Sequence, residues 1–269
     1  MPTLAYTRSG AGAPLVLLHG IGLDRRSWDP VIPALARRFD VIAVDLPGFG
    51  QSAPGGQADP RALAGAVAAL LTEAGVTAPH LAGNSLGGWV APELAALRPV
   101  ASLTLLSPAG LWQRDTPRYC RVSLQASRWL ARHAAGPLSR LARFRLGRVL
   151  VLGQTHGRPA RLTPEYARTA IQAMGTCPGF EATLAATARR RFLATAPISA
   201  PVTVAFGSRD VLLLPRQSRH LDQLPAGTKA ETLPGCGHVP IADDPAAVAE
   251  LITRTTARAG QAADSRIRA

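Results

Sequence analysis

The residues around Ser85 have the composition of a turn that carries a nucleophile. Ser85 lies in the pentapeptide Gly83 to Gly87, which has the form Gly-x-Ser-x-Gly. An apolar, strand-like run over 80–83 precedes it, and a helix-like run over 89–97 follows. On a sharp turn between a strand and a helix, a serine hydroxyl projects above the sheet edge, where a substrate can reach it. The alternative is a glycine-rich surface turn with an incidental serine, so the interpretation depends on further residues.

A serine hydroxyl needs a base to become a nucleophile, and the base needs a third group to orient it. Asp210 follows the apolar run 202–206 in Gly-Ser-Arg-Asp, and His238 follows 232–233 in Gly-Cys-Gly-His. The C-terminal ends of parallel strands meet at one edge of a sheet. We therefore predict that Ser85, Asp210 and His238 converge as nucleophile, orienting carboxylate and general base. Alone, His238 could be a loop histidine and Asp210 a turn residue, but their order and their glycine-marked loops favour a triad.

Acyl transfer also requires donors for the oxyanion of the tetrahedral intermediate. The Leu86 amide stands at the start of the predicted helix and is the first candidate. The loop after the apolar run 15–18 reads His-Gly-Ile-Gly and should supply the second donor. We predict the Ile21 amide for this role, with Gly22 in reserve.

Other polar residues near these motifs are better explained as structural. His19 lies in the same loop as Ile21, and we interpret it as bracing that loop. Asp45 begins the glycine-rich segment 45–52, which we interpret as a structural turn. The remaining histidines lack a motif and are interpreted as structural or exposed: His80, His133, His156 and His220.

Apolar runs alternate with helical patterns over most of the chain. Predicted strands cover 3–8 at an edge, then 15–18, 41–44, 80–83, 101–106, 201–206 and 229–233, and predicted helices cover 31–38, 60–74 and 89–97. Continuous apolar runs are typical of parallel strands buried on both faces. The sequence therefore predicts an α/β fold with a mostly parallel central sheet and helices on both faces.

The middle of the chain breaks this alternation. Four successive helical patterns occur without a strand between them, over 116–133, 138–152, 164–174 and 179–195. Their place after a strand end puts them over Ser85. We predict a core domain of residues 1–111 and 197–253, an inserted all-helical cap of residues 112–196, and a frayed C-terminal tail of residues 254–269.

Together these motifs resemble the α/β-hydrolase family, in an esterase-like branch with a serine nucleophile and a helical cap. The motifs at 19–22, 45–52, 83–88, 207–210 and 237–238 occur in the family's order, and the resemblance covers roughly 15–111 and 201–251. It implies a Ser-His-Asp triad and a covalent acyl-enzyme intermediate, with no metal or cofactor.

The resemblance leaves the substrate open, because esterases, lactonases, carbon–carbon bond hydrolases and perhydrolases share these motifs. Ser85 stands where the dehalogenase and epoxide hydrolase branches use aspartate, which argues against both. The loop after Gly20 lacks the Ser-Gly-Pro-Gly run that carbon–carbon bond hydrolases tend to carry. Pro92, inside the predicted helix after Ser85, departs from the family pattern and should alter the helix more than the chemistry.

The positive charge of the chain is concentrated in the predicted cap. Residues 112–196 hold fifteen arginines and three acidic residues, and so twelve of the thirteen net positive charges. The same segment holds seven of the thirteen aromatic residues, and Trp112 and Trp129 are predicted to contact substrate. One interpretation is an amphipathic lid over an apolar pocket. The other is an anionic partner: an acidic substrate, an acyl carrier protein or an anionic membrane surface. We expect no nucleic-acid partner, because no recognised binding motif accompanies the charge.

Composition restricts the compartment. Three widely spaced cysteines argue against a disulfide framework or a zinc site and fit a reducing cytoplasm. No apolar run is long enough for a transmembrane helix. The N-terminal residues lack the basic stretch followed by an apolar stretch that is typical of a signal peptide.

The sequence thus predicts a cytoplasmic carboxylic-ester hydrolase acting on a small to medium, largely apolar ester. Alternatives are an esterase for an acidic or carrier-bound acyl ester, a lactonase, a carbon–carbon bond hydrolase, or a ligand-sensing protein that does not turn over. A basic surface-binding module with incidental hydrolysis is a weaker rival. The oligomeric state is not predicted.

Overall fold

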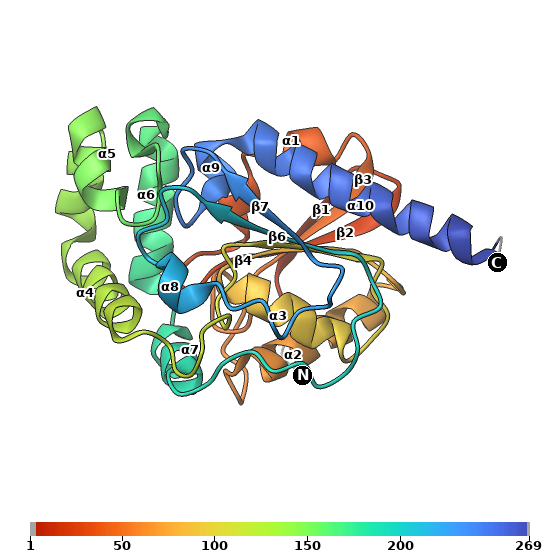
Figure 1. The fold of residues 1–269 in the computed structure, drawn as a ribbon. Helices are drawn as coiled ribbons and strands as arrows, with labels where there is room; N and C mark the ends of the chain where they lie inside the picture. Colours follow the sequence, from red (N-terminus) through yellow and green to blue (C-terminus); the bar gives the residue numbers. More distant parts are fainter. Residues whose placement is uncertain (1–3, 268–269) are drawn as a thin grey trace.

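Within residues 4–267, which the computed structural model describes, a seven-stranded sheet forms the centre of the protein (Figure 1). The strand order is β1-β3-β2-β4-β5-β6-β7, and every neighbouring pair is parallel except β1 with β3. The strands are β1 Tyr6–Ser9, β2 Ala13–Leu18, β3 Phe39–Val44, β4 His80–Asn84, β5 Ser102–Leu106, β6 Val202–Gly207 and β7 Lys229–Leu233.

The middle of the sheet is buried on both faces. All residues of β5 and β6 are buried, and only the first residue of β4 is partly accessible. The apolar run Leu15–Leu18 is likewise fully buried, as expected of a strand with no polar side to turn toward water. The antiparallel strand β1 lies at the edge, and its four residues are exposed. The predicted mostly parallel α/β fold is therefore confirmed.

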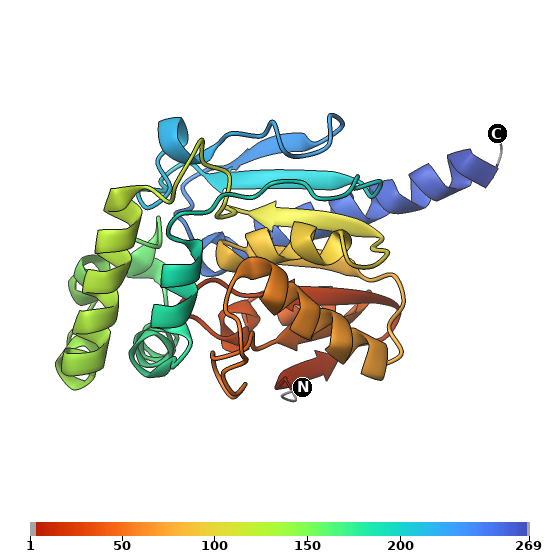
Figure 2. The ribbon, with the colours of Figure 1, turned by 90° about the horizontal axis from the view of Figure 1, so that it is seen from below.

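Helices cover both faces of this sheet (Figures 1 and 2). On one face lie α2 (Pro60–Glu73) and α3 (Leu86–Ala95), which pack against each other and contribute to one apolar cluster. On the other face lie α1 (Ile32–Leu35) and α10 (Pro245–Ile267), which contribute to a second cluster. Three short elements complete the core: η1 Arg25–Trp28, α8 Pro215–Ser218 and α9 Pro240–Asp243.

The C-terminal segment differs from the sequence prediction. We expected a frayed tail from residue 254, but α10 continues to Ile267, and residues 268–269 lie outside the described part. Polar side chains dock this helix on β6: Thr255 Oγ1 is 2.8 Å from Thr203 Oγ1, and Arg258 donates to the Val202 carbonyl over 3.1 Å. These hydrogen bonds hold α10 against the sheet as far as Arg258 and replace the apolar periodicity on which the prediction relied.

Four helices between β5 and β6 form a layer beyond the C-terminal ends of the strands (Figures 1 and 2). They are α4 Arg118–Leu141, α5 Arg145–Leu152, α6 Pro164–Thr176 and α7 Phe180–Thr187, with the short η2 Pro159–Arg161 before α6. We refer to them as the helical insertion. In the described part of the chain, no helix is both long and apolar enough to cross a membrane.

A break inside α4 lies where the pattern placed it. Residues 134–137 were expected to separate two helices, and α4 consists of two helical parts joined at a kink, where Ala134 has the non-helical angles φ −131° and ψ 26°. The chain turns later, into α5, and the buried Arg148 closes this corner. Its guanidinium donates to the carbonyls of Ala142 and Arg143 over 3.0 Å each, which satisfies acceptors exposed at the end of α4.

The last helix of the insertion is shorter than predicted. The pattern indicated a helix to Thr195, whereas α7 ends at Thr187. The following chain is extended because it returns to the core: Phe192 is buried, and its amide donates to the Gly110 carbonyl over 3.0 Å. Trp112 Nε1 donates to the Arg190 carbonyl over 2.6 Å and fixes the same segment.

One buried carboxylate joins the insertion to the loop that carries His238. Asp243 accepts hydrogen bonds from the amides of Gly157 at 2.7 Å and Arg158 at 2.8 Å, both in the insertion. It also accepts one from Gly237 at 2.7 Å. A side chain on Gly237 would collide with the backbone of His156, so the approach of the two segments requires glycine there.

His156 is the buried titratable group at this junction. It is 3% exposed, and its ring nitrogens lie 2.9 Å from Thr155 Oγ1 and 3.2 Å from the Tyr166 hydroxyl. Burial lowers the pKa of His156 to about 4, although the Asp243 carboxylate acts in the opposite direction. The imidazole is therefore neutral in the folded protein at neutral pH.

Replacing Asp243 should loosen this junction. We expect Asp243→Asn to lower the free energy of unfolding by about 1–3 kcal/mol, because an amide replaces an anion that accepts three buried hydrogen bonds. Asp244→Asn is the matched control, since asparagine keeps the helix cap and only a partly exposed ion pair with Arg158 is lost. Equal losses of stability in urea unfolding would contradict this role for Asp243.

His156 should make folding sensitive to acid. The unfolded chain binds a proton at an ordinary histidine pKa near 6.5, and the folded chain binds it only near pH 4. Stability should therefore fall as pH drops from 6.5 toward 4, by on the order of 3 kcal/mol from this residue. The expected result is a shallower decline of unfolding free energy over this range in His156→Gln than in the wild type. Parallel curves would exclude His156 as the source.

Candidate active site

Ser85 lies in a strained turn between β4 and α3. Its backbone has φ 53° and ψ −112°, a conformation that a residue with a side chain adopts only when its surroundings enforce it. A side chain on Gly87 would collide with the Leu18 carbonyl, so α3 can start this close to β2 only with glycine. The Ser85 amide donates to the Leu106 carbonyl over 3.0 Å and fixes the turn to β5. This is the strand-turn-helix geometry that presents a nucleophile.

Asp210 and His238 meet at the ends of β6 and β7. His238 Nδ1 lies 3.0 Å from Asp210 Oδ2, and both side chains are almost completely buried. The other carboxylate oxygen accepts the amides of Leu212 at 2.9 Å and Leu213 at 2.8 Å. Since the carboxylate can only accept, the hydrogen bond assigns the proton to Nδ1 and leaves Nε2 free to take up a proton.

Two opposing effects determine the pKa of Asp210. Burial raises it, but the charge and hydrogen bond of His238 lower it, as do the Leu213 and Leu212 amides. The lowering effects prevail, and the pKa of Asp210 lies below the ordinary value for aspartate. The carboxylate is therefore ionised at neutral pH and can stabilise a positive charge on the imidazole.

Ser85 and His238 face the same space. Both side chains line two adjoining cavities, together with Ile21, Leu124 and Leu212. Between described residues, no hydrogen bond links the Ser85 hydroxyl to the imidazole. Such a contact is often long without a substrate and tightens in the reacting complex. The three residues predicted as a triad thus lie at one site: Asp210 bonds to His238, and His238 lines the same cavities as Ser85.

Asn84 makes contacts at the candidate site that the sequence did not indicate. It is completely buried, and its Nδ2 donates to the carbonyls of Leu106 and His238, over 3.0 Å each. The residue before the nucleophile therefore ties the end of β4 to β5 and to the histidine backbone. The Gly-x-Ser-x-Gly pattern leaves this position open, so only the tertiary structure reveals its contacts.

The two predicted oxyanion donors lie beside Ser85. Leu86 is the first residue of α3, and Ile21 lines both cavities. Within the described residues, neither backbone amide donates to a protein acceptor, so both are available to a ligand. The N-terminus of α3 adds a favourable field for negative charge. Gly22, the reserve candidate, follows Ile21 in the same turn and is not among the residues that line either cavity.

His19 and Asp45 have the structural surroundings expected of them. His19 is completely buried, its Nδ1 lies 2.8 Å from the Gly20 carbonyl, and its Nε2 accepts the Leu46 amide over 3.0 Å. Burial lowers the pKa of His19, so the ring is neutral and holds two loops together. Asp45 accepts the Gln51 amide over 2.9 Å and forms an ion pair with Arg25.

A mostly apolar cavity of about 250 Å³ opens beside Ser85 and His238. The floor comes from the core, including Ile21 and Leu212, and most of the walls come from the insertion. The residues that the insertion contributes are mainly aliphatic: Leu124, Leu130, Ala131, Leu138, Leu141, Leu150, Val151, Leu152, Ala170, Ile171 and Met174. Such a cavity is suited to an apolar group.

A second cavity of about 30 Å³ lies on another side of the same pair. Trp112, one of the two predicted substrate contacts, lines it and packs edge-on against Trp89 with ring centroids 5.5 Å apart. Cys120 also lines this space, and burial raises the pKa of its thiol to about 12, so the sulfur stays protonated. Ser85 therefore lines both a large and a small apolar space.

Trp129, the other predicted substrate contact, faces away from the site. It is 61% exposed on the outside of α4 and stacks on His133 with ring centroids 5.0 Å apart. The prediction was wrong because the helix turns this position outward, whereas Leu124 and Ala131 point inward. Within residues 4–267, no three His, Cys, Asp or Glu side chains cluster in a way that could hold a metal ion.

Known proteins share this architecture. The structure of a thermophilic esterase from Thermogutta terrifontis superposes with a TM-score of 0.75 at 24% identity, covering 95% of this chain and 93% of that chain. An epoxide hydrolase of Mycobacterium tuberculosis is 32% identical over 198 residues, 71% of this chain and 92% of that protein. A pimeloyl-[acyl-carrier protein] methyl ester esterase of Aeromonas hydrophila is 43% identical over 109 residues, 40% of this chain.

These likenesses differ in extent. The chain spans 41% of the Aeromonas esterase, and 30% and 35% of two other relatives with comparable identity. By contrast, the sequence model of the alpha/beta hydrolase family matches residues 15–251, from β2 to α10. This match includes the turn at Ser85 and the loops of Asp210 and His238. The chain belongs to the alpha/beta hydrolase family.

Proposed function

We propose that this protein is a carboxylic-ester hydrolase that acts through Ser85. The supporting observation is the buried Asp210–His238 pair with a free imidazole nitrogen beside Ser85. In the proposed reaction Ser85 Oγ attacks the ester carbonyl while its proton passes to His238 Nε2, and the amides of Leu86 and Ile21 stabilise the oxyanion. The C–O bond breaks, and the alcohol leaves with that proton.

Water completes the cycle. His238 takes a proton from a water molecule, which attacks the acyl-enzyme, and the proton returns to Ser85 as the acid is released. Asp210 fixes the tautomer of His238 and stabilises the imidazolium that forms twice in each cycle. The protein groups in these steps are Ser85, His238, Asp210 and the two backbone amides, and water is the second reactant.

The proposed substrate is an ester with one large and one small apolar substituent. The two cavities of unequal size that Ser85 lines support this proposal. We further propose that residues 112–196 act as the cap domain, because they supply most of the walls of the larger cavity. A reducing compartment such as the cytoplasm stays a proposal, supported by the three buried free thiols of Cys120, Cys177 and Cys236.

Related chemistries are alternatives that a substrate panel can separate. Lactones, carbon–carbon bond substrates and esters graded by chain length should be compared at equal enzyme concentration. A serine in place of the aspartate used for epoxide opening disfavours that reaction. A ligand-sensing protein would give a single turnover, whereas an esterase recycles.

Loss of the Ser85 hydroxyl should abolish turnover. We expect Ser85→Ala to reduce kcat for a p-nitrophenyl short-chain ester by roughly 10⁴-fold or more, because no other group can form the acyl-enzyme. A fluorophosphonate should label Ser85 in the wild type, as read by mass spectrometry. Ser123→Ala, on α4 outside both cavities, is the matched control and should keep its activity. Activity retained in Ser85→Ala would exclude this mechanism.

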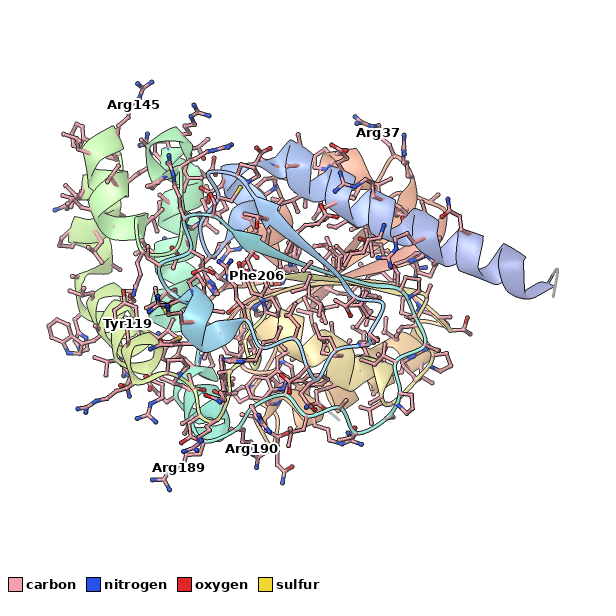
Figure 3. All side chains as sticks on the ribbon, viewed as in Figure 1. Arg37, Tyr119, Arg145, Arg189, Arg190 and Phe206 are labelled. Carbon is pink, nitrogen blue, oxygen red and sulfur yellow. The ribbon has the colours of Figure 1, made fainter. Side chains whose placement is uncertain are left out.

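A second candidate is an esterase for acyl groups bound to a carrier protein. The relative from Aeromonas hydrophila is described as acting on such an ester, although the match covers only part of each protein. Arg189 and Arg190 are exposed at the end of α7 and project from this edge of the molecule (Figure 3). They line a surface hollow with Arg121, next to Leu184, which also lines the smaller cavity. This arrangement supports docking of an acidic carrier beside the site.

Reversing these charges should affect only a carrier-bound substrate. We expect Arg189→Glu with Arg190→Glu to raise KM for an acyl-carrier-protein ester by roughly tenfold or more and to leave hydrolysis of a p-nitrophenyl ester unchanged. High salt should have the same selective effect. Activity on the carrier-bound ester that stays flat between low and high salt would exclude this candidate.

A further inference from the structure

An exposed apolar patch lies at the corner between α4 and α5. Its five large side chains are each at least 41% exposed, and three of them are 68–78% exposed. We call this patch the α5 face: Leu141, Phe144, Leu146, Val149 and Leu150. Single exposed apolar residues are ordinary, but five within ten positions mark an interaction surface. In Figure 1, α4 and α5 form the side of the insertion farthest from the sheet, so this face borders solvent.

Positive charge surrounds the α5 face. Arg143 and Arg145 are exposed within residues 141–150, Arg140 is exposed directly before them, and none of the three forms an ion pair with a described residue. Residues 116–164 contain ten arginines and no acidic residue, so no neighbour in sequence neutralises them. Arg148 differs, because it is buried and hydrogen-bonded to backbone carbonyls. In Figure 3, Arg145 projects from the end of α5 away from the rest of the protein.

The α5 face is continuous with the substrate cavity. Leu141 and Leu150 belong to the α5 face and also line the cavity beside Ser85. Leu138 lines the cavity from the preceding turn of α4. An apolar chain held against the α5 face would therefore contact side chains that also line the cavity beside Ser85.

We propose that the α5 face binds the surface of an anionic lipid bilayer and that the cavity receives its substrate from that surface. Exposed aromatic and aliphatic side chains among unpaired arginines are typical of helices that lie in the interface of such bilayers. A second copy of this chain fits less well, because two α5 faces would bring like charges together. The delivery of substrate rests on the proposed ester hydrolysis, whereas the binding of lipid does not.

Vesicle cosedimentation tests binding without chemistry. The Ser85→Ala protein at low ionic strength would be mixed with vesicles of equal parts phosphatidylglycerol and phosphatidylcholine, and with vesicles of phosphatidylcholine alone. We expect clear preference for the anionic vesicles and loss of binding in high salt. Arg143→Glu with Arg145→Glu should weaken binding by roughly tenfold or more. Phe144→Ser with Leu146→Ser, which do not line the cavity, should weaken it to a similar degree.

Arg37→Glu with Arg38→Glu is the matched control. It makes the same change in net charge at two exposed arginines, and Figure 3 shows Arg37 on the core, far from Arg145. This variant should bind anionic vesicles within about twofold of the unchanged protein. The variants are made in both the Ser85→Ala and the wild-type background, and hydrolysis of a soluble p-nitrophenyl ester by the latter reports that each one is folded.

Three outcomes would overturn the proposal. The first is absence of binding to anionic vesicles, and the second is an equal loss in the Arg37/Arg38 control. The third is a dimer in sedimentation velocity that Phe144→Ser with Leu146→Ser dissociates, which would show that a second copy covers the face. If the protein binds vesicles but hydrolysis does not require Ser85, the proposed reaction is refuted and the proposed lipid-binding role of the α5 face is retained.

Discussion

The site depends on the hydrogen bond between His238 Nδ1 and Asp210 Oδ2. It joins two loops separated by 28 positions in sequence, and it forms where almost no water reaches either side chain. In such surroundings a carboxylate without partners would favour its protonated form. Here the Leu212 and Leu213 amides and the imidazole together keep it charged. The same hydrogen bond therefore orients the His238 ring and keeps the Asp210 carboxylate ionised.

Backbone contacts hold this pair in place. The Arg209 amide donates to the Cys236 carbonyl over 2.8 Å, and the Gly235 amide donates to Ser208 Oγ over 2.8 Å, so the loops after β6 and β7 act as one unit. Asn84 links that unit to the turn of Ser85, and Asp243 links it to the insertion. The roof of the cavity and the imidazole are consequently positioned by the same buried hydrogen bonds. A substitution in the insertion should therefore shift the loop of His238, and a substitution in that loop should shift the insertion.

The helical insertion serves two environments at once. Its inner side supplies an aliphatic wall, and most of its arginines are exposed on its outer side. At α5 the two environments meet, because Leu141 and Leu150 are exposed and also line the cavity. With the charge distributed in this way, the electrostatic attraction for an anion is stronger beside the entrance of the site than elsewhere on the protein.

The sequence by itself determined the sheet, the turn at Ser85 and the identity of the residues that meet there. These features are local: apolar runs mark buried strands, and glycines flank positions where backbones approach closely. It could not determine the outward direction of Trp129, the early end of α7 or the continuation of α10, because each depends on a distant contact. The segment after α7 is extended because the Phe192 amide bonds to the Gly110 carbonyl, and α10 continues because Thr255 bonds to Thr203. The contacts of Asn84, His156 and Asp243 were likewise decided only by the tertiary structure. A buried hydrogen bond between distant residues produces no periodic pattern in the sequence.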